Sequence, residues 1–380
     1  MRFSVNLDVF SEAVSFPVAM LPSRIAQAIL GGVLLEAADG KVTFSIFNFE
    51  VSAKTSINAE VTEPGRAVVP GKLLANIAKK LRGSEIELEV VDNKVQITSG
   101  QNTFQLPVMP VEEYPQLPSL EKITGEVRGS DFATAISQVF PAASSEDVTP
   151  VITSVRLHVV DNTLTLTATD RYRVAIRGIE WENHSDQNEI VALVPARVLH
   201  EVSKQLPHAE TVQIVIQADG DRQMIGFIAD GKAITSQLVS GNFPPVERLF
   251  PSNTEHSAVI NTAELREAVD LVSVIVDQDT ALRFNFTDGN VSLHAIGSEA
   301  AQGSSSVDAH LAGNDIDISL KPNFLKDGLN GAQSEFTKIA FTWNEAQNKP
   351  GPVLITGQRS RDEASEHDFK YLLQPNLLMR

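Results

Sequence analysis

Turn signals followed by alternating apolar and polar residues occur three times along the chain. Asp39-Gly40, Asp161-Asn162 and Asp288-Gly289 each precede a segment with apolar side chains at every second position. Asp, Asn and Gly tolerate the positive φ angles of a tight hairpin turn, and period-two alternation indicates a strand with one buried face. The nearly constant interval between the turns, about 125 residues, indicates an internal repeat.

A proline at the head of an amphipathic segment is the second recurring feature. Pro70, Pro195 and Pro322 follow one another at nearly the same interval as the turns. The apolar residues of the first copy have the spacing of a helix with one buried face, and they are Leu73, Leu74, Ile77, Ala78 and Leu81. Proline suits the first helical position, where its missing N–H has no partner to lose. Each segment is therefore predicted to be a helix that begins at its proline.

A closing proline and an opening helix complete the repeating unit. Pro115, Pro244 and Pro375 keep the interval of the other two features. The second copy opens with a helical pattern whose buried face comprises Phe132, Ala135, Ile136 and Val139. In the third copy, Asn261 and Glu264 have the spacing of a capping box. Each unit is thus predicted to run helix, strands, helix, strands.

The predicted fold class is α+β, with three tandem domains in which two helices pack on antiparallel sheets. Their expected bounds are 1–120, 125–248 and 255–380, separated by segments rich in proline, glycine and polar residues. A length of 380 residues suits two or three domains of roughly 100–200 residues. Three unrelated α+β domains are the alternative, but they would leave the shared spacings unexplained.

Composition excludes several classes of protein. The chain has no cysteine, which removes disulfides, thiolate metal sites and cysteine nucleophiles. Its longest plainly apolar run, Ile190 to Val194, is far shorter than the roughly 20 residues of a membrane-spanning helix. The first residues lack the basic and apolar pattern of a secretory signal, so we expect a cytoplasmic protein without a membrane segment.

One predicted helix reverses the acidic character of the chain, whose formal net charge is −17. Residues 70–83 contain Lys72, Lys79, Lys80 and Arg82 and no acidic residue. The second copy carries Arg197 and Lys204 at the offsets of Lys72 and Lys79, whereas the third has Phe324 and Gly331 there, with Lys321 and Lys326 nearby. Such a basic stripe favours phosphate binding, although a merely solvated helix face stays an alternative.

No catalytic motif is evident. Residues 226–232 have the glycine and lysine spacing of a phosphate loop, but Ala233 stands where a hydroxyl must bind magnesium, so Asp230-Gly231 is interpreted as a hairpin turn. Asp170 lies in the charged segment Thr169-Asp170-Arg171-Tyr172-Arg173, without a partner base or nucleophile. We therefore expect no cofactor, no metal and no catalysis. An enzyme centred on Asp170 and a repeat-built adhesin are the alternatives.

Several segments together resemble the bacterial DNA polymerase III beta subunit, the sliding clamp, over essentially the whole chain. They are the opening Phe3-Ser4-Val5, Pro22-Ser23-Arg24, Leu30 to Leu35, Ala168 to Val174, Phe243-Pro244 and Tyr371-Leu372-Leu373-Gln374-Pro375. The resemblance implies a homodimeric head-to-tail ring of six domains, with helices lining a hole around duplex DNA. It also implies a non-catalytic processivity factor that binds DNA without regard to sequence. The implied protein partners are the polymerase III alpha subunit, the clamp loader, other polymerases and repair proteins, through short linear peptides.

The resemblance also implies three sets of site residues. Those expected to face DNA are Arg24, Lys72, Lys79, Arg197 and Lys204. Those of a peptide-binding pocket are Ile152, Thr169, Arg171, Tyr172, Arg173, Val174, Pro244, Arg248, Leu249, Leu372, Leu373, Gln374 and Pro375. Those of the dimer interface are Phe104, Leu106, Val274 and Ile275. Two departures concern the carboxyl end, where Gln374 replaces a frequent Met and Leu377 replaces the usual Arg.

Overall fold

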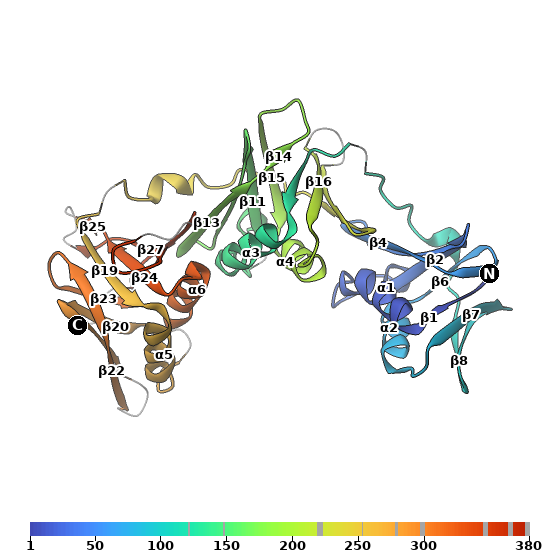
Figure 1. The fold of residues 1–380 in the computed structure, drawn as a ribbon, viewed down its shortest axis with the longest axis horizontal. Coiled ribbons are helices and arrows are strands. Elements are labelled where there is room, and N and C mark those ends of the chain that lie inside the picture. The colour runs from blue at the N-terminus through green and yellow to red at the C-terminus, as the bar shows by residue number, and fades with distance from the viewer. Residues whose placement is uncertain are drawn as a thin grey trace. The chain divides into compact units, whose positions relative to one another are not determined.

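Two compact units make up the chain in the computed structural model. The residues that the structure describes are 1–120, 122–146, 149–218, 223–252, 254–277, 280–296, 301–344, 349–363 and 368–376. The N-terminal unit comprises residues 1–133, 182–188 and 197–238, and the C-terminal unit comprises 134–181, 189–196 and 239–380. The central repeat contributes strands to both units, so each is described by itself (Figure 1).

The helices follow the predicted order of two per repeat. The α-helices of the described residues are α1 (Leu7–Ala19), α2 (Gly71–Lys80), α3 (Gly129–Val139), α4 (Ala196–Gln205), α5 (Thr262–Ser273) and α6 (Pro322–Ala332). Short 3-10 helices are η1 (Ala28–Gly31), η2 (Val111–Glu113), η3 (Phe140–Ala142), η4 (Pro150–Thr153) and η5 (Val246–Leu249). Among the described helices, none combines the length and the apolar composition that a bilayer span needs.

Antiparallel sheets build the N-terminal unit. Its strands are β1 (Arg2–Asn6), β2 (Gly32–Ala38), β3 (Lys41–Phe47), β4 (Val51–Asn58), β5 (Glu60–Glu63), β6 (Gly65–Pro70), β7 (Glu85–Val91), β8 (Lys94–Ser99), β9 (Asn102–Pro107), β10 (Gly125–Arg128), β14 (Glu182–Asn183), β16 (Thr211–Gln217), β17 (Met224–Ala229) and β18 (Lys232–Gln237). One sheet has the order β5-β1-β7-β8-β9, and the other has the order β14-β10-β16-β17-β18-β4-β3-β2-β6. Helices α1 and α2 lie side by side, and α1 also packs on β3 and β4 (Figure 1).

A single long antiparallel sheet dominates the C-terminal unit. Its strands are β11 (Ser154–Val160), β12 (Thr163–Thr169), β13 (Arg173–Glu180), β15 (Glu189–Pro195), β19 (His256–Asn261), β20 (Leu282–Thr287), β21 (Gly289–Ile296), β22 (Gln302–Ala312), β23 (Ile316–Leu320), β24 (Phe336–Phe341), β27 (Val353–Gln358) and β28 (Phe369–Leu373). They are ordered β15-β11-β12-β13-β28-β27-β24-β19-β22-β21-β20-β23. A separate pair joins β25 (Trp343–Asn344) to β26 (Lys349–Pro350).

Each predicted turn contains a positive φ angle, at both central residues in two of the turns and at Asp161 (51°) and Gly289 (87°) in the other two. Asp39 and Gly40 have φ angles of 50° and 71°, and Asp230 and Gly231 have 51° and 72°. Positive φ at both central residues is the geometry that matches a two-residue turn to the twist of its strands. The second pair therefore closes the β17–β18 hairpin, as interpreted from the sequence, where Ala229 faces Lys232.

The predicted helix faces are confirmed except at two points. In α3, Phe132, Ala135, Ile136 and Val139 are all buried. In α2, however, Leu73 is 46% exposed, and the helix buries Ala75 together with the predicted Leu74 and Ala78. The position of the proline also differs between copies. Pro322 is the first residue of α6, whereas Pro70 and Pro195 are the last residues of β6 and β15 and directly precede their helices.

Candidate functional site

A strained turn between β12 and β13 forms the centre of the predicted pocket. The Asp170 Oδ1 accepts hydrogen bonds from the backbone N–H groups of Tyr172 (3.0 Å) and Arg173 (3.1 Å). The Thr169 hydroxyl donates to the carbonyl of Arg173 at 2.7 Å. Arg171 adopts a φ of 80°, a left-handed conformation that non-glycine residues rarely take. The turn leaves the side chain of Tyr172 60% exposed.

The floor beside this turn is apolar. Val174, Val246 and Leu372 form a buried cluster. The partly buried side chains packed against it are Ile176, Phe243, Phe250 and Leu354. Val174 faces Leu372 across the antiparallel pair β13–β28, which joins the second repeat to the third. The residue that follows β28 is hydrogen-bonded to the turn, because the N–H of Gln374 donates to the carbonyl of Tyr172 at 2.9 Å.

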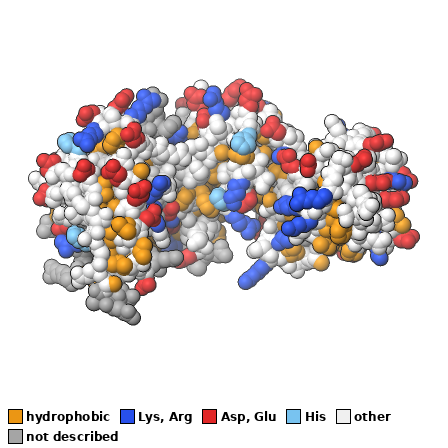
Figure 2. Space-filling model, turned by 60° about the horizontal axis from the view of Figure 1, so that its bottom comes forward, with side chains coloured by type: hydrophobic (Ala, Val, Ile, Leu, Met, Phe, Trp, Pro, Cys, Tyr) orange, Lys and Arg blue, Asp and Glu red, His pale blue; other side chains and the backbone are white. Residues whose placement is uncertain are grey.

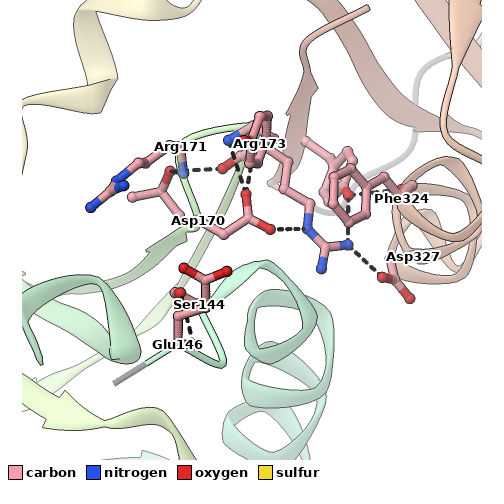
Figure 3. A network of polar contacts seen from close by, with 10 residues as sticks. Ser144, Glu146, Asp170, Arg171, Arg173, Phe324 and Asp327 are labelled. Carbon is pink, nitrogen blue, oxygen red and sulfur yellow. Dashed lines mark hydrogen bonds and ion pairs between the residues drawn. The ribbon is translucent and has the colours of Figure 1, made fainter. Parts of the chain in front are cut away.

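Arg173 connects the turn to the third repeat (Figure 3). Its Nε donates to Asp170 Oδ2 at 2.8 Å, and its Nη1 donates to Asp327 of α6. The guanidinium also lies 4.1 Å from the centre of the Phe324 ring. Burial alone would lower the pKa of Arg173, but Tyr371, Asp327 and Asp170 together raise it above its ordinary value. Arg173 therefore keeps its positive charge although its side chain is largely buried.

The predicted pocket residues all lie in the C-terminal unit, on elements that meet near this turn. Ile152, Thr169, Arg173, Val174, Leu372 and Leu373 are buried, and Pro244 and Pro375 are partly buried. Side chains left exposed at the surface include Tyr172, Arg171, Arg248, Leu249 and Gln374. Arg171 donates to the hydroxyl of Thr149 at 2.9 Å. Leu377 and the rest of the tail lie outside the described residues.

Sequence reasoning missed several contributors to the pocket. Val246 occupies the floor, and its position two residues after Pro244 was the available signal. Arg156 stacks over Phe243 at 5.6 Å and pairs with Glu247. Asp327 reaches Arg173 across 154 residues of sequence, and no local pattern indicates such a contact.

The basic residues predicted to face DNA are exposed on the N-terminal unit. Lys72 and Lys79 lie on the solvent side of α2, and Arg197 and Lys204 lie on that of α4. The Lys72 ammonium donates to the carbonyl of Pro22 at 3.0 Å, which places the loop of Arg24 beside α2. Figure 2 shows Lys and Arg side chains gathered over this unit on the side where the helices lie.

Helices α2 and α4 differ in whether acidic side chains neutralise their basic residues. Lys204 pairs with Glu201 at 3.0 Å on α4. Helix α2 carries no acidic residue, so its lysines have no such neighbour on the helix. We therefore expect the stronger attraction for phosphate at α2.

Packing explains why the third repeat lacks the basic pair. Phe324 stands at the offset of Lys72 and receives the guanidinium of Arg173 on its ring. Gly331 stands at the offset of Lys79, and an added Cβ there would come within 2.4 Å of the Phe369 ring. The Gly331 carbonyl also accepts from the Gln138 side chain at 2.6 Å. These two positions serve packing in the C-terminal unit.

The predicted interface residues lie on an open strand edge or at the end of a helix beside one. Strand β9 is the last in its sheet, with Phe104 42% exposed and Leu106 only 2% exposed, so Leu106 packs in the core of its own subunit. Strand β22 pairs with β21 over Gln302–Ala309 but with β19 only over Ala309–Ala312. One side of residues 302–308 is therefore without a strand partner among the described residues. Val274, 79% exposed, lies at the end of the neighbouring helix α5.

One group of possible metal ligands emerges from strand pairing. Glu126 and Glu182 face each other across β10 and β14, and His184 follows on the same edge. The His184 ring contacts Glu182 at 3.1 Å and Glu126 at 3.9 Å. The His184 Nε2 lies within hydrogen-bond distance of Glu182, and Glu126 accepts from the side chain of Gln213 at 2.8 Å. No sequence pattern indicates the group, because only the sheet register brings Glu126 to Glu182.

Comparisons with known proteins agree over the length of the chain. Profiles of the DNA polymerase III beta subunit match in succession, its N-terminal domain over residues 1–118, its central domain over 126–245 and its C-terminal domain over 247–363. The beta sliding clamp of Streptomyces coelicolor is 37% identical over 376 residues and covers 99% of both chains. A beta sliding clamp homolog of Streptomyces muensis, GriR, is 34% identical over 375 residues and also covers 99% of both.

Solved structures share the fold. The Bacillus subtilis sliding clamp has a TM-score of 0.89 at 24% identity and covers 100% of both chains. The Pseudomonas aeruginosa clamp bound to griselimycin has a TM-score of 0.88 at 21% identity, again over 100% of both. With three successive domain profiles and full-length relatives at 37% and 34% identity, the chain belongs to the bacterial DNA polymerase III beta subunit family, the beta sliding clamps.

Proposed function

We propose that the chain serves as a processivity clamp by joining head to tail with a second copy into a ring around duplex DNA. It acts without catalysis, in the cytoplasm, and it holds polymerases and other partners through short peptides. The observation that carries the proposal is a pair of strand edges, β9 and β22, that match the two joints already formed within the chain.

The joints between repeats follow one rule. Each repeat contains a set of three consecutive antiparallel strands, which are β2-β3-β4, β11-β12-β13 and β20-β21-β22. The third strand of the set pairs antiparallel with the final strand of the next repeat. In the first joint β4 pairs with β18, and in the second β13 pairs with β28. The remaining members of the two series are β22 and β9. A closed, head-to-tail arrangement satisfies every such edge, because each copy offers β22 to the β9 of its partner.

The repeats also supply a register for the missing joint. In the first joint Ala53 faces Ile234, and in the second Ala175 faces Tyr371. Gly303 is equivalent to both alanines. In each repeat the first residue after the turn has a partner on the third strand, and these partners are Asn58, Glu180 and Asp308. Ala53, Ala175 and Gly303 each lie five positions before that partner. Phe104 is equivalent to Ile234, since each is the third residue of its strand. The expected pair across the interface is therefore Gly303 with Phe104.

The surroundings of Gly303 suit this pairing. The side chain of Ile275 lies over it, at 3.1 Å from the place where a Cβ would be. A large aromatic ring opposite a glycine covers backbone that would otherwise be exposed. Ile275 and the exposed Val274 would then contact the ring of Phe104, which accounts for three of the four residues predicted for the interface.

Encirclement explains how an acidic protein stays on DNA. The lysines of α2 and the Arg24 loop offer phosphate contacts that carry no sequence information. In a ring such contacts need only be weak, because topology retains the duplex. Weak contacts also permit sliding.

The pocket of the C-terminal unit suits a short peptide. It combines an apolar floor with the exposed Tyr172 and Leu249 at its rim, and such clefts bind an anchor side chain. We assign this pocket to the polymerase alpha subunit, the clamp loader and repair proteins.

Crosslinking tests the ring and its register, and the absence of native cysteine makes it specific. The register places Gln105 opposite Gln302 of the partner, so the variant Gln105→Cys with Gln302→Cys should oxidise to a covalent dimer. Loaded on nicked circular DNA and then oxidised, this dimer should remain on the circle in denaturant and be released after linearisation.

The matched control is Gln105→Cys with Ser304→Cys, which shifts one partner by two positions on the same strand face. Equal crosslinking of both variants would contradict the register. Equal release from circular and linear DNA would contradict encirclement.

A further inference from the structure

We propose that Asp327 of α6 is a positioning residue for the peptide pocket, which it holds open for binding by fixing Arg173 and, through it, the Thr169–Arg173 turn. The inference rests on the pocket assignment of the proposed function. It adds a residue that lies in a different repeat from the turn and acts through another side chain.

The contacts form a chain from α6 to the pocket (Figure 3). The Asp327 carboxylate accepts from Arg173 Nη1, and Asp170 Oδ2 accepts from Arg173 Nε at 2.8 Å. The other oxygen of Asp170 holds the N–H groups of Tyr172 and Arg173. One guanidinium therefore links the carboxylate of a helix in the third repeat to the carboxylate that shapes the turn.

Burial makes this link strong. The side chain of Arg173 is 9% exposed, that of Asp170 is 13% exposed and that of Asp327 is 33% exposed. Hydrogen bonds between charged groups are shorter and stronger than neutral ones, and removing one partner leaves an uncompensated charge in a poorly solvated place. Loss of Asp327 would leave Asp170 as the carboxylate that balances Arg173, and Nη1 would keep the weaker hydrogen bond to the Tyr371 hydroxyl at 3.3 Å, so the guanidinium would be held less firmly.

The same helix also contacts the exposed aromatic side chain of the turn. The rings of Phe324 and Tyr172 lie 6.3 Å apart, and the Arg173 guanidinium packs on the Phe324 ring. The Tyr371 hydroxyl donates to the Phe324 carbonyl at 2.7 Å. Asp327 thus fixes Arg173, and with it the turn that presents the exposed ring of Tyr172 to an incoming peptide.

An equivalent turn shows that the ion network is not needed to fold such a turn. In the first repeat the Asn48 Oδ1 accepts from the N–H groups of Glu50 and Val51, and Phe49 is left-handed with a φ of 73°. The N–H of Gln237 donates to Glu50, as that of Gln374 does to Tyr172. Val51 stands where the pocket turn has Arg173. Because that turn forms with an amide in place of the Asp170 carboxylate and a valine in place of Arg173, the network beside the pocket has a role beyond local folding.

The test compares Asp327→Asn with Asp327→Glu in the full-length dimer. The probe is a fluorescent peptide that spans the clamp-binding segment of the alpha subunit of the same organism. We expect Asp327→Asn to bind about tenfold more weakly, since a charge-assisted hydrogen bond is removed. Asp327→Glu should recover most of the affinity. Arg173→Lys should weaken binding, and adding Asp327→Asn to it should cause little further loss.

Asp270→Asn is the matched control. Asp270 pairs with Lys326, the neighbour of Asp327 on α6, at 2.9 Å, and has no contact with Arg173 among those described. It should keep the affinity of the wild type while losing another, more exposed ion pair of the same helix. If the wild-type dimer itself fails to bind the peptide, the pocket assignment is wrong. If the wild type binds and Asp327→Asn binds equally well, the positioning role is wrong.

A second measurement separates positioning from general destabilisation. The melting temperatures of Asp327→Asn and Asp327→Glu should lie close together while their affinities differ. Losses of affinity that follow the melting temperature, with no rescue by glutamate, would overturn the proposal. Should Asp327→Asn fail to fold, Arg173→Lys compared with Asp270→Asn decides the same question, because equal affinities there would also overturn it.

Discussion

Phe49 and Arg171 adopt the same left-handed backbone conformation at equivalent places in the first and second repeats, with φ angles of 73° and 80°. Both turns follow an Asn or Asp that accepts two backbone hydrogen bonds, and both receive a hydrogen bond from a glutamine N–H. The floors beside them differ. Val174 faces Leu372 beside Arg171, whereas Ser52 and Thr235 join by a buried hydrogen bond of 2.6 Å beside Phe49.

This difference predicts a single peptide site in each chain. Leu372→Thr with Val174→Ser would give the second joint the polar pair of the first, and should abolish peptide binding because the apolar floor is removed. The control is Ser52→Val with Thr235→Leu, which changes the first joint only. Calorimetric titration should give one site in the wild type, none in the first variant and one of unchanged affinity in the control. A second site in the wild type would contradict the prediction.

Substitutions at Phe104 and Leu106 should distinguish a residue of the dimer interface from a residue of the core. Leu106→Ala removes a fully packed side chain and should lower the free energy of unfolding by about 2–5 kcal/mol. Phe104→Ala should leave the unfolding of the monomer nearly unchanged but weaken the dimer, as measured by sedimentation across a concentration series. A dimer of wild-type affinity in Phe104→Ala would rule out its interface role.

The two basic helices should contribute unequally to DNA binding. Lys79→Ala should weaken the binding of the dimer to a short duplex more than Lys204→Ala, because Lys204 is already paired with Glu201. Glu201→Gln should strengthen binding by freeing Lys204. Anisotropy titrations at several salt concentrations should show the logarithmic slope for Lys79→Ala reduced by about 0.9 for each phosphate that is no longer neutralised. Equal effects of the two alanine variants would argue against the unequal charge balance.

Alkaline pH should destabilise the protein partly through Tyr114. Burial raises the pKa of its hydroxyl to about 12, against about 10 in an unfolded chain. The unfolded state loses this proton first, so the stabilising effect is complete below pH about 10 and falls by roughly 2–3 kcal/mol as pH rises through about 12.

Tyr114→Phe provides the comparison, although it removes the acceptor of the Phe47 N–H. The variant should be less stable near neutral pH but should lose stability more gradually between pH 10 and 12. Tyr371, whose pKa burial also raises, contributes to both proteins and cancels in the difference. Parallel pH profiles in urea unfolding would contradict the assignment.

Local features of the sequence predict the repeats well. Turn chemistry at Asp39-Gly40 and Asp161-Asn162 and the apolar face of α3 act over a few residues, so their patterns are recognisable without knowledge of the fold. The exposure of Leu73 was not predictable in this way, because helical spacing allowed several adjacent faces and only tertiary packing selected one.

The site was predictable only in part. The resemblance supplied the turn and the end of β28, but Asp327 reaches Arg173 through the packing of α6, which no spacing encodes. Likewise, only their contacts explain why Phe324 and Gly331 stand where the other repeats carry basic residues. Strand pairing between repeats connects residues far apart in the chain, as in Ala53 with Ile234, and it lies beyond any local pattern.

The apolar floor of the proposed pocket lies on the strand pair β13–β28, so the proposed docking site and the joint between the second and third repeats share one structural element. If the β13–β28 pairing between the second and third repeats were broken, the proposed pocket would be lost with it. In the proposed ring, opening the seam between subunits leaves this strand pair, and with it the proposed pocket, intact.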